Sequence, residues 1–440
     1  VFTADPRAPV VLGQAATRLL QERHYPRAVL AAADLVAWQP YPGDELVMPA
    51  WLVIGHGEFE QDNYPEAEQA YLQALALMPE QDSRQADTME QLASSIYRQG
   101  ELAAASGQHL AAADHFARVI ELTPDSNVRV NAQYDAAISY RQARDLDHAN
   151  ALFRDFRERY PGHELSGGIA AILVENYEAA ENWQAAALEL DAITASSDNT
   201  AVQREALYLS AQYYMKAGNT SQAIARYRSY AHNWPEPLQM RIEAMLSLAD
   251  IYASESAPGK RHFWLNAMAD AHESAGPAAT DRSRYLAASS ASELADWYYD
   301  EFQAISLGHP LKETMRLKRK AMDRTISGYE RVNSYGLQEF GTRATYRLGQ
   351  VYRQLSIDLM ASERPAGLDT LALEQYELLL EEQAWPFEEK AVSIHEANAR
   401  RAWQGTYDKW IESSFTALGQ MMPARWGKQE SRVSFSREVR

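Results

Sequence analysis

The sequence predicts an all-α fold of stacked helical hairpins, and three periodic features indicate it. An alanine returns at intervals of 39, 45, 37, 37 and 37 residues. Mostly apolar side chains follow it after four and seven positions, and in five of the six copies a proline stands twelve positions after it. The alanines are Ala28, Ala67, Ala112, Ala149, Ala186 and Ala223; the residues four positions later are Ala32, Tyr71, Phe116, Phe153, Leu190 and Tyr227. Those seven positions later are Leu35, Ala74, Val119, Phe156, Ile193 and Tyr230, and the prolines are Pro40, Pro79, Pro124, Pro161 and Pro235.

This spacing predicts a pair of packed helices in each unit. Positions four and seven apart share one face of a helix, a small residue lets a neighbouring helix approach closely, and a proline ends the helix. Another small or apolar residue stands twelve positions before each alanine, which predicts a preceding helix that packs there. These residues are Ala16, Gly55, Gly100, Ala137, Val174 and Ala211.

One unit matches a known repeat pattern at six positions. Trp51, Gly55, Ala67, Tyr71, Ala74 and Pro79 reproduce the Trp, Gly, Ala, aromatic, Ala, Pro pattern of the tetratricopeptide repeat. The chain therefore resembles the tetratricopeptide repeat (TPR) superfamily over residues 9–235, and this resemblance implies a right-handed superhelix of hairpins. Two departures are Glu58 where the pattern has an aromatic residue, and the missing proline after Ala186.

The predicted domain organisation follows from these repeats and from the changes after them. Gly276-Pro277 suggests a boundary, because three longer helices are predicted beyond it, over 281–305, 311–332 and 339–361. Pro386 is expected to open a long final helix, since Glu388 and Glu389 would lie in its first turn. The predicted parts are an N-terminal extension (1–8), six TPR-like hairpins (9–237), a degenerate helical pair (238–276), a long-helix subdomain (277–385), a C-terminal capping helix (386–426) and a polar tail (427–440).

The long-helix subdomain contains a sequence that resembles one more TPR unit. Its predicted first helix carries Leu348, Gly349 and Tyr352, and its predicted second helix carries Ala372, Tyr376 and Leu379. An insertion around residues 361–365 would lengthen the hairpin between them.

Composition limits the classes of function. A net charge of −18 argues against a nucleic-acid binder. The chain has no cysteine, which suits an oxidising compartment, and we expect a periplasmic protein. No segment is apolar over a length that could cross a bilayer. The first residue is Val1 rather than Met, which suggests processing or trimming, so any signal sequence, lipid anchor or earlier repeat would lie outside this sequence.

Motifs for catalysis or cofactor binding are not found in the sequence. There is no phosphate loop and no Gly-x-Ser-x-Gly turn. His395-Glu396 lacks the second histidine that a zinc protease helix needs, and the other histidines are scattered. We therefore expect no enzymatic activity, no cofactor and no bound metal.

The TPR resemblance implies a binding groove lined by the first helix of each hairpin. Carried over by repeat position, the candidate residues are Asn131, Tyr134, Ile138, Arg141 and Gln142 in one unit and Glu205, Tyr208, Gln212, Met215 and Lys216 two units later. Tyrosine, arginine and methionine often supply binding energy at protein interfaces. The alternative is that Tyr134 and Tyr208 pack between helices.

A second candidate surface is a run of positive charge in the predicted helix 311–332. It comprises Lys312, Arg316, Lys318, Arg319, Lys320 and Arg324, opposed by Glu313 and Asp323. It is either a docking patch for an acidic partner or lipid headgroup, or a solvated helix face.

The C-terminal sequence is similar to that of long TPR proteins of Gram-negative bacteria found with TolQ/ExbB-type and TonB-type machinery. The similarity covers the blocks 386–391, 394–403, 407–410 and 422–426. It implies an envelope-associated scaffold that binds peptides or helices of partner proteins, such as inner-membrane motor components. The alternatives are a peptidoglycan-binding or accessory subunit for a cell-wall enzyme, and a cytosolic TPR adaptor.

Overall fold

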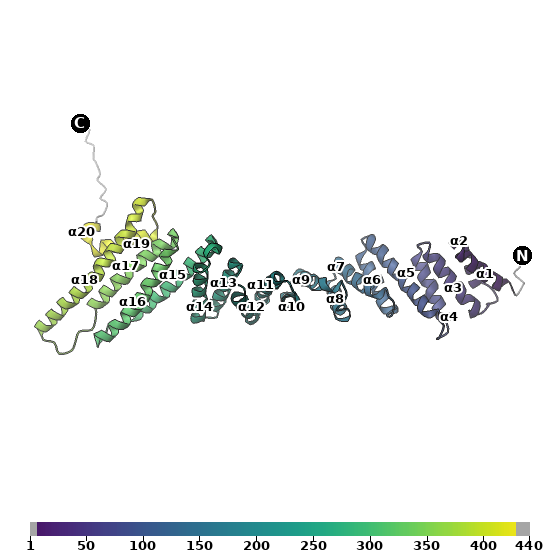
Figure 1. The fold of residues 1–440 in the computed structure, drawn as a ribbon, viewed down its shortest axis with the longest axis horizontal. Coiled ribbons are helices and arrows are strands. Elements are labelled where there is room, and N and C mark those ends of the chain that lie inside the picture. Colours follow the sequence, from purple (N-terminus) through teal and green to yellow (C-terminus); the bar gives the residue numbers. More distant parts are fainter. Residues whose placement is uncertain (1–6, 428–440) are drawn as a thin grey trace, which may run out of the picture. The chain divides into compact units, whose positions relative to one another are not determined.

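The computed structural model describes residues 7–427, and every regular element in this range is a helix (Figure 1). The helices follow one another as antiparallel hairpins, so the predicted all-α, TPR-type hairpin fold is confirmed. The chain forms two compact units, of which unit 1 ends at Gln203 and unit 2 begins at Arg204. None of the helices between residues 7 and 427 combines the length and the apolar character of a membrane span.

Unit 1 consists of five successive helical hairpins. Its helices are α1 (Ala8–Gln21), α2 (Tyr25–Val36), α3 (Asp44–Phe59), α4 (Tyr64–Leu77), α5 (Gln85–Ala105), α6 (His109–Leu122), α7 (Arg129–Gln142), α8 (Leu146–Arg159), α9 (Ser166–Ala179) and α10 (Trp183–Ser196). The prolines at 79, 124 and 161 follow the ends of α4, α6 and α8, as the repeat pattern predicts.

The repeated small residues are the positions of closest helix packing. All six repeat alanines have no exposed surface, and the residues four positions later are also buried. Among the residues seven positions later, only Ile193 keeps partial exposure. A Cβ atom at Gly55 would lie 2.6 Å from the ring of Tyr71, and one at Gly100 would lie 2.6 Å from the ring of Phe116. These two positions therefore need glycine because an aromatic ring of the second helix occupies the space.

The turn inside each hairpin has one recurring backbone conformation. The residue five positions before the repeat alanine always has a positive φ, between 53° and 74°. These residues are Arg23, Asp62, Gly107, Arg144, Glu181 and Gly218. Ser256 has the same conformation between two helices of unit 2, which shows that the degenerate pair after residue 237 is a hairpin of the same kind.

Unit 2 contains shorter hairpins followed by longer helices. Its elements are α11 (Thr200–Lys216), within which the boundary between the units falls, α12 (Thr220–Asn233), α13 (Leu238–Ser254), α14 (Pro258–Glu273), the 3₁₀ turn η1 (Gly276–Ala278), α15 (Asp281–Ala304), α16 (Leu311–Ser334), α17 (Gln338–Met360), α18 (Thr370–Arg400), the 3₁₀ turn η2 (Arg401–Gln404), α19 (Lys409–Met421) and α20 (Pro423–Trp426). The three longer helices predicted over 281–361 agree with α15, α16 and α17.

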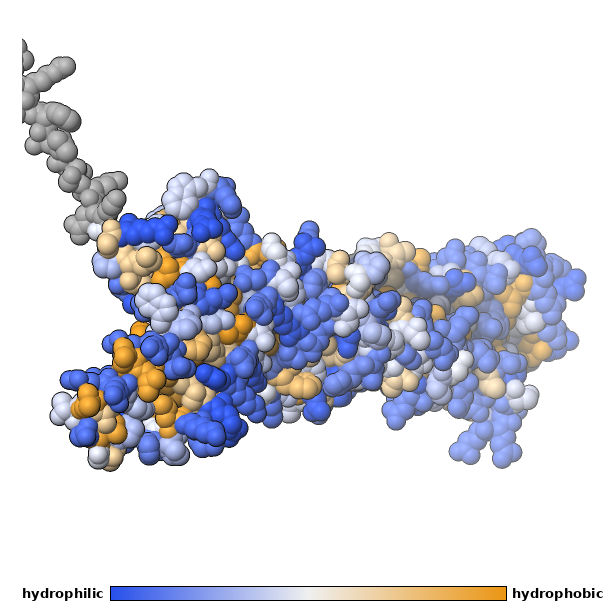
Figure 2. Space-filling model, turned by 60° about the vertical axis from the view of Figure 1, so that its left-hand side comes forward, coloured by the Kyte–Doolittle hydropathy of each residue, from blue (hydrophilic) through white to orange (hydrophobic). Residues whose placement is uncertain are grey.

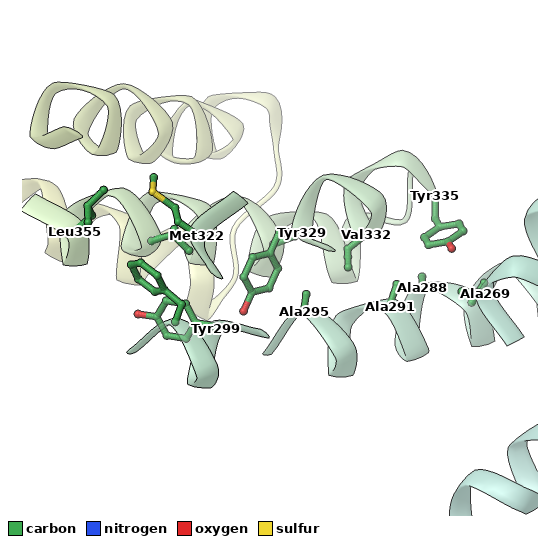
Figure 3. Packing of buried hydrophobic residues seen from close by; sticks show 14 of the residues in the cluster. Ala269, Ala288, Ala291, Ala295, Tyr299, Met322, Tyr329, Val332, Tyr335 and Leu355 are labelled. Atoms are coloured by element: carbon green, nitrogen blue, oxygen red, sulfur yellow. The ribbon is translucent and has the colours of Figure 1, made fainter. Parts of the chain in front are cut away.

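A single apolar core runs through the turn that the sequence suggested as a boundary. Ala269 of α14 belongs to the same buried cluster as Ala288 and Ala291 of α15. Figure 3 shows the alanines of α15 facing Tyr329, Val332 and Tyr335 of α16. Small side chains on one helix thus make room for large ones on the next, and η1 does not separate two cores.

The degenerate TPR unit is built from different residues than the sequence suggested. A Cβ atom at Gly349 would lie 2.5 Å from Nε2 of His395, which is fully buried. Ala391 and His395 keep the four-residue spacing of Ala67 and Tyr71. However, Ala391 stands 42 residues after Gly349, whereas Ala67 stands 12 residues after Gly55. Leu379, which the sequence suggested as the core residue seven positions after Ala372, is 56% exposed. The assignment to Ala372, Tyr376 and Leu379 was wrong because α18 is long enough for its second half to make this contact.

The predicted capping helix over 386–426 was also wrong in its bounds. Pro386 lies inside α18, which begins at Thr370 and ends at Arg400. Gly405 then adopts φ +87°, and Asp408 begins α19 by accepting hydrogen bonds from the backbone N–H groups of Trp410 (2.9 Å) and Ile411 (3.0 Å). Of the predicted polar tail only Gly427 is described; the rest lies outside the described residues, as do residues 1–6 of the N-terminal extension.

His395 makes the stability of this region dependent on pH. Its Nδ1 lies 3.4 Å from Oγ of Ser414, and burial, with a smaller effect of Arg353, lowers its pKa to about 4. In the unfolded chain the pKa of a histidine is near 6.5, so between pH 6.5 and pH 4 the unfolded chain binds more protons than the folded chain. The contribution of His395 to the free energy of unfolding is therefore fully present above pH 6.5 and decreases as the pH falls towards 4.

We predict that the free energy of unfolding falls by about 2 kcal/mol between pH 7.5 and pH 5 through His395. Urea unfolding of the intact chain at both values, followed by tryptophan fluorescence, measures the loss. His395→Gln should lose less than wild type over the same interval. An identical loss in His395→Gln would contradict the assignment.

Candidate partner-binding surfaces

The candidate groove residues of α7 divide into packed and exposed side chains. The ring of Tyr134 lies edge-on to Phe153 and to Phe156, with centroids 5.7 Å apart in both pairs, and Ile138 joins the same apolar cluster. Arg141 forms an ion pair with Glu175 of α9. Asn131 and Gln142 are exposed.

The candidate residues of α11 divide in the same way. The ring of Tyr208 lies edge-on to Tyr227 (5.8 Å) and Tyr230 (5.2 Å), and burial followed by the nearby Tyr227 raises its pKa to about 12. Lys216 places its ammonium 5.1 Å from the ring centre of Tyr213. Glu205, Gln212 and Met215 are exposed. Tyr134 and Tyr208 therefore support the alternative role that the sequence left open, that of packing between helices.

Sequence reasoning did not single out Tyr97, which occupies the same repeat position in α5. Its hydroxyl donates a 2.5 Å hydrogen bond to Asp135 of α7, and its ring lies 5.1 Å from that of Phe116. The spacing of 37 residues between Tyr97 and Tyr134 could have revealed it. In three hairpins, therefore, this tyrosine packs against the helices that follow it.

Most of the candidate basic patch on α16 is exposed, but Lys318 is not part of that surface. Its side chain is buried, its ammonium donates to the carbonyl of Ile305 (2.7 Å) and it lies 2.7 Å from Oδ2 of Asp358 on α17. The Phe302 ring centre is 4.3 Å from the same ammonium. Lys318 therefore joins α15, α16 and α17.

The other cations of the patch differ in their contacts. Arg324 lies 3.9 Å from the ring centre of Tyr298 and 3.2 Å from a carboxylate oxygen of Glu301. Arg316 lies 3.3 Å from Glu313 on its own helix. Lys312, Arg319 and Lys320 are exposed. The exposed part of the patch is thus smaller than the sequence suggests.

A third surface, which sequence reasoning missed, lies on the first half of α18. Leu371, Leu378 and Trp385 are 66%, 58% and 65% exposed, and they are spaced by seven residues. The seven-residue spacing was visible in the sequence, but Ala372, Tyr376 and Leu379 of this segment were assigned to a hairpin core.

Groups of three or more His, Cys, Asp or Glu side chains arranged to hold a metal ion do not occur among residues 7–427.

Two segments of the chain match the family described as "Tetratricopeptide repeat". They are residues 131–163, which contain most of α7 and all of α8, and residues 205–237, which contain most of α11 and all of α12. The chain therefore contains tetratricopeptide repeats, and proteins with such repeats generally act as protein-interaction scaffolds. No curated protein matches the chain.

Several solved structures are similar to the chain at low identity. PilW, described as a widely conserved type IV pilus biogenesis factor, shares 15% identity over 53% of this chain and 97% of its own, with a TM-score of 0.24. A structure of Naa15/Naa10 bound to HypK-THB shares 16% identity over 94% of this chain and 64% of its own, with a TM-score of 0.31. A tetratricopeptide repeat protein from Parabacteroides merdae shares 11% identity over 70% of this chain and 98% of its own, with a TM-score of 0.24.

We predict that Lys318→Ala lowers the free energy of unfolding by about 3 kcal/mol, because it leaves Asp358 and the Ile305 carbonyl without their cation. Lys320→Ala, on the exposed side of the same helix, should change it by less than about 0.5 kcal/mol. Urea unfolding followed by circular dichroism compares the two. Equal effects of the two substitutions would contradict a structural role for Lys318.

Proposed function

We propose that this protein is a non-enzymatic scaffold that holds a peptide or helix of a partner protein against the first helices of its hairpins. The observation that carries the proposal is that α7 and α11 each have both packed and exposed side chains. These two helices are the first helices of the two segments that match the tetratricopeptide repeat. On each of them the tyrosine contributes to packing, while polar neighbours such as Gln142 and Gln212 stay exposed.

Such a surface suits a partner chain with polar side chains and a few apolar anchors. On α7, exposed asparagine and glutamine can donate and accept hydrogen bonds beside Arg141. On α11, Gln212 can do the same beside Glu205, and Met215 offers a flexible apolar contact. Because the hairpin core fixes the backbone of each helix, the backbone that carries these side chains is already ordered before a partner binds.

We place this scaffold in the periplasm of a Gram-negative cell, as part of an envelope complex of the TonB or Tol kind. Two features of the sequence support this. The chain has no cysteine that could mispair in an oxidising compartment, and its C-terminal blocks are similar to those of long periplasmic TPR proteins.

Photocrosslinking in living cells tests the proposal. We expect a photoreactive residue at Gln142 or Gln212 to capture a partner, and the same residue at Glu158 of α8 or Arg228 of α12, which are also exposed, to capture much less. Mass spectrometry then identifies what is bound. Periplasmic proteins or inner-membrane proteins with periplasmic segments are the expected result.

Two results would overturn the proposal. Capture only from the second helices would place the binding surface elsewhere, and capture of cytosolic proteins would refute the compartment. Because Tyr134 and Tyr208 pack inside hairpins, they are left unchanged in this experiment.

A further inference from the structure

The first half of α18 is apolar on two opposite sides. On one side Leu380 and Ala384 are buried, and α18 packs along α17. On the other side Leu371, Leu378 and Trp385 form a stripe that is more than half exposed. A helix with apolar residues on both sides is normally covered on both. Among the described residues nothing covers the second side, and Figure 2 shows apolar surface on the C-terminal part of unit 2.

The exposed stripe lies among carboxylates, of which one is paired with a cation. Between Thr370 and Glu389 the helix carries glutamates at 374, 377, 381, 382, 388 and 389 and no lysine or arginine. Glu377 lies 3.6 Å from Arg364. Within residues 7–427 none of the other five takes part in an ion pair. The face is therefore both apolar and negatively charged.

The stripe continues into a cleft at the C-terminal end of unit 2. The cleft has a volume of about 600 Å³ and is lined by apolar side chains, among them Trp385, Val392, Met421 and Met422. Its charged lining consists of Glu388, Glu389 and Glu396 and of Arg425, which is paired with Glu396 at 2.8 Å. Methionine side chains adapt to the shape of an apolar anchor. The cleft thus offers a place for one large side chain beyond the linear stripe.

Charge decides which occupant fits this face. A second copy of α18 would bring glutamates against glutamates, and an anionic lipid surface would be repelled in the same way. A partner helix with apolar residues seven apart could pack these residues on the stripe. Lysine or arginine beside them could pair with the carboxylates. We propose that this α18 face binds a cationic amphipathic helix of a partner protein, at a site separate from the first-helix residues of α7 and α11.

A model peptide tests the site directly. The probe is a fluorescein-labelled helix of about two heptads made only of leucine and lysine, with the leucines on one side. Fluorescence anisotropy measures its Kd for the full chain. We expect Leu371→Ser together with Leu378→Ser to weaken binding by about 10-fold or more.

A matched control distinguishes binding at this site from non-specific binding to exposed leucines. Leu30 and Leu188, on α2 and α10, are 65% and 55% exposed, almost the same as Leu371 and Leu378. Leu30→Ser together with Leu188→Ser should leave the Kd within about twofold. Since all four side chains are exposed, both double variants should unfold at the same temperature as wild type. A difference in Kd between them then cannot come from a loss of folded protein.

The charge of the face is tested by neutralising it. Substitution of Glu381, Glu382 and Glu389 by glutamine should weaken probe binding at low salt and reduce its salt dependence. A counterpart peptide with glutamate in place of every lysine should bind at least about 10-fold more weakly than the probe.

Four outcomes would overturn the proposal. They are equal Kd values for the two leucine double variants, equal binding of the acidic peptide, a dimer in sedimentation equilibrium that depends on Leu371 and Leu378, and binding to phosphatidylglycerol vesicles that depends on the same two leucines. None of them bears on crosslinking from Gln142 or Gln212, so failure of this site and failure of the proposed function are distinguishable.

Discussion

Close approach of paired helices at small residues is the constraint on which the rest of this structure depends. The repeat alanines have no exposed surface, and Gly55 and Gly100 lie directly under aromatic rings of the following helix. Because each hairpin buries only one helix pair, it needs its neighbours to cover the remaining apolar side chains. The outward side chains of the first helices take little part in this packing, so packing places few limits on which residues stand there. The exposed positions at which we propose partner binding thus follow from how the hairpins stack.

The C-terminal part of unit 2 follows the same rule with longer helices. Alanines of α15 make room for tyrosines of α16, and Gly349 makes room for His395. Longer helices, however, have more surface than one neighbour can cover. Lys318 shows one solution, in which a buried cation joins three helices. The exposed stripe of α18 shows the other, in which apolar surface is left for an external partner.

The sequence predicted the hairpin units well because alanine, aromatic and proline positions repeat at fixed spacing. It could not reveal that Arg144 and Glu181 have a positive φ, since glycine marks this position only at Gly107 and Gly218. It placed Lys318 on the surface because a buried lysine needs a partner from another helix, and such contacts are not visible in one segment.

The partner of Gly349 was misplaced because Ala372 and Tyr376 repeat the four-residue spacing of the true pair by coincidence. The end of α18 was readable in principle from Gly405 and Asp408, which are typical stop and start residues. For the candidate groove, repeat position placed the candidate residues on the first helices of the hairpins, but it could not separate packed tyrosines from exposed neighbours.

A pair of substitutions on α8 tests the central constraint most directly. Ala149 is fully buried and Ala151, two residues away, is exposed. Hydrogen exchange of Ala149→Leu should show loss of protection in α7, α8 and α9, equivalent to about 1–3 kcal/mol of overpacking, while the first hairpins of unit 1 stay protected. Ala151→Leu should match wild type. Equal protection in both variants, or a loss spread evenly over unit 1, would contradict the account.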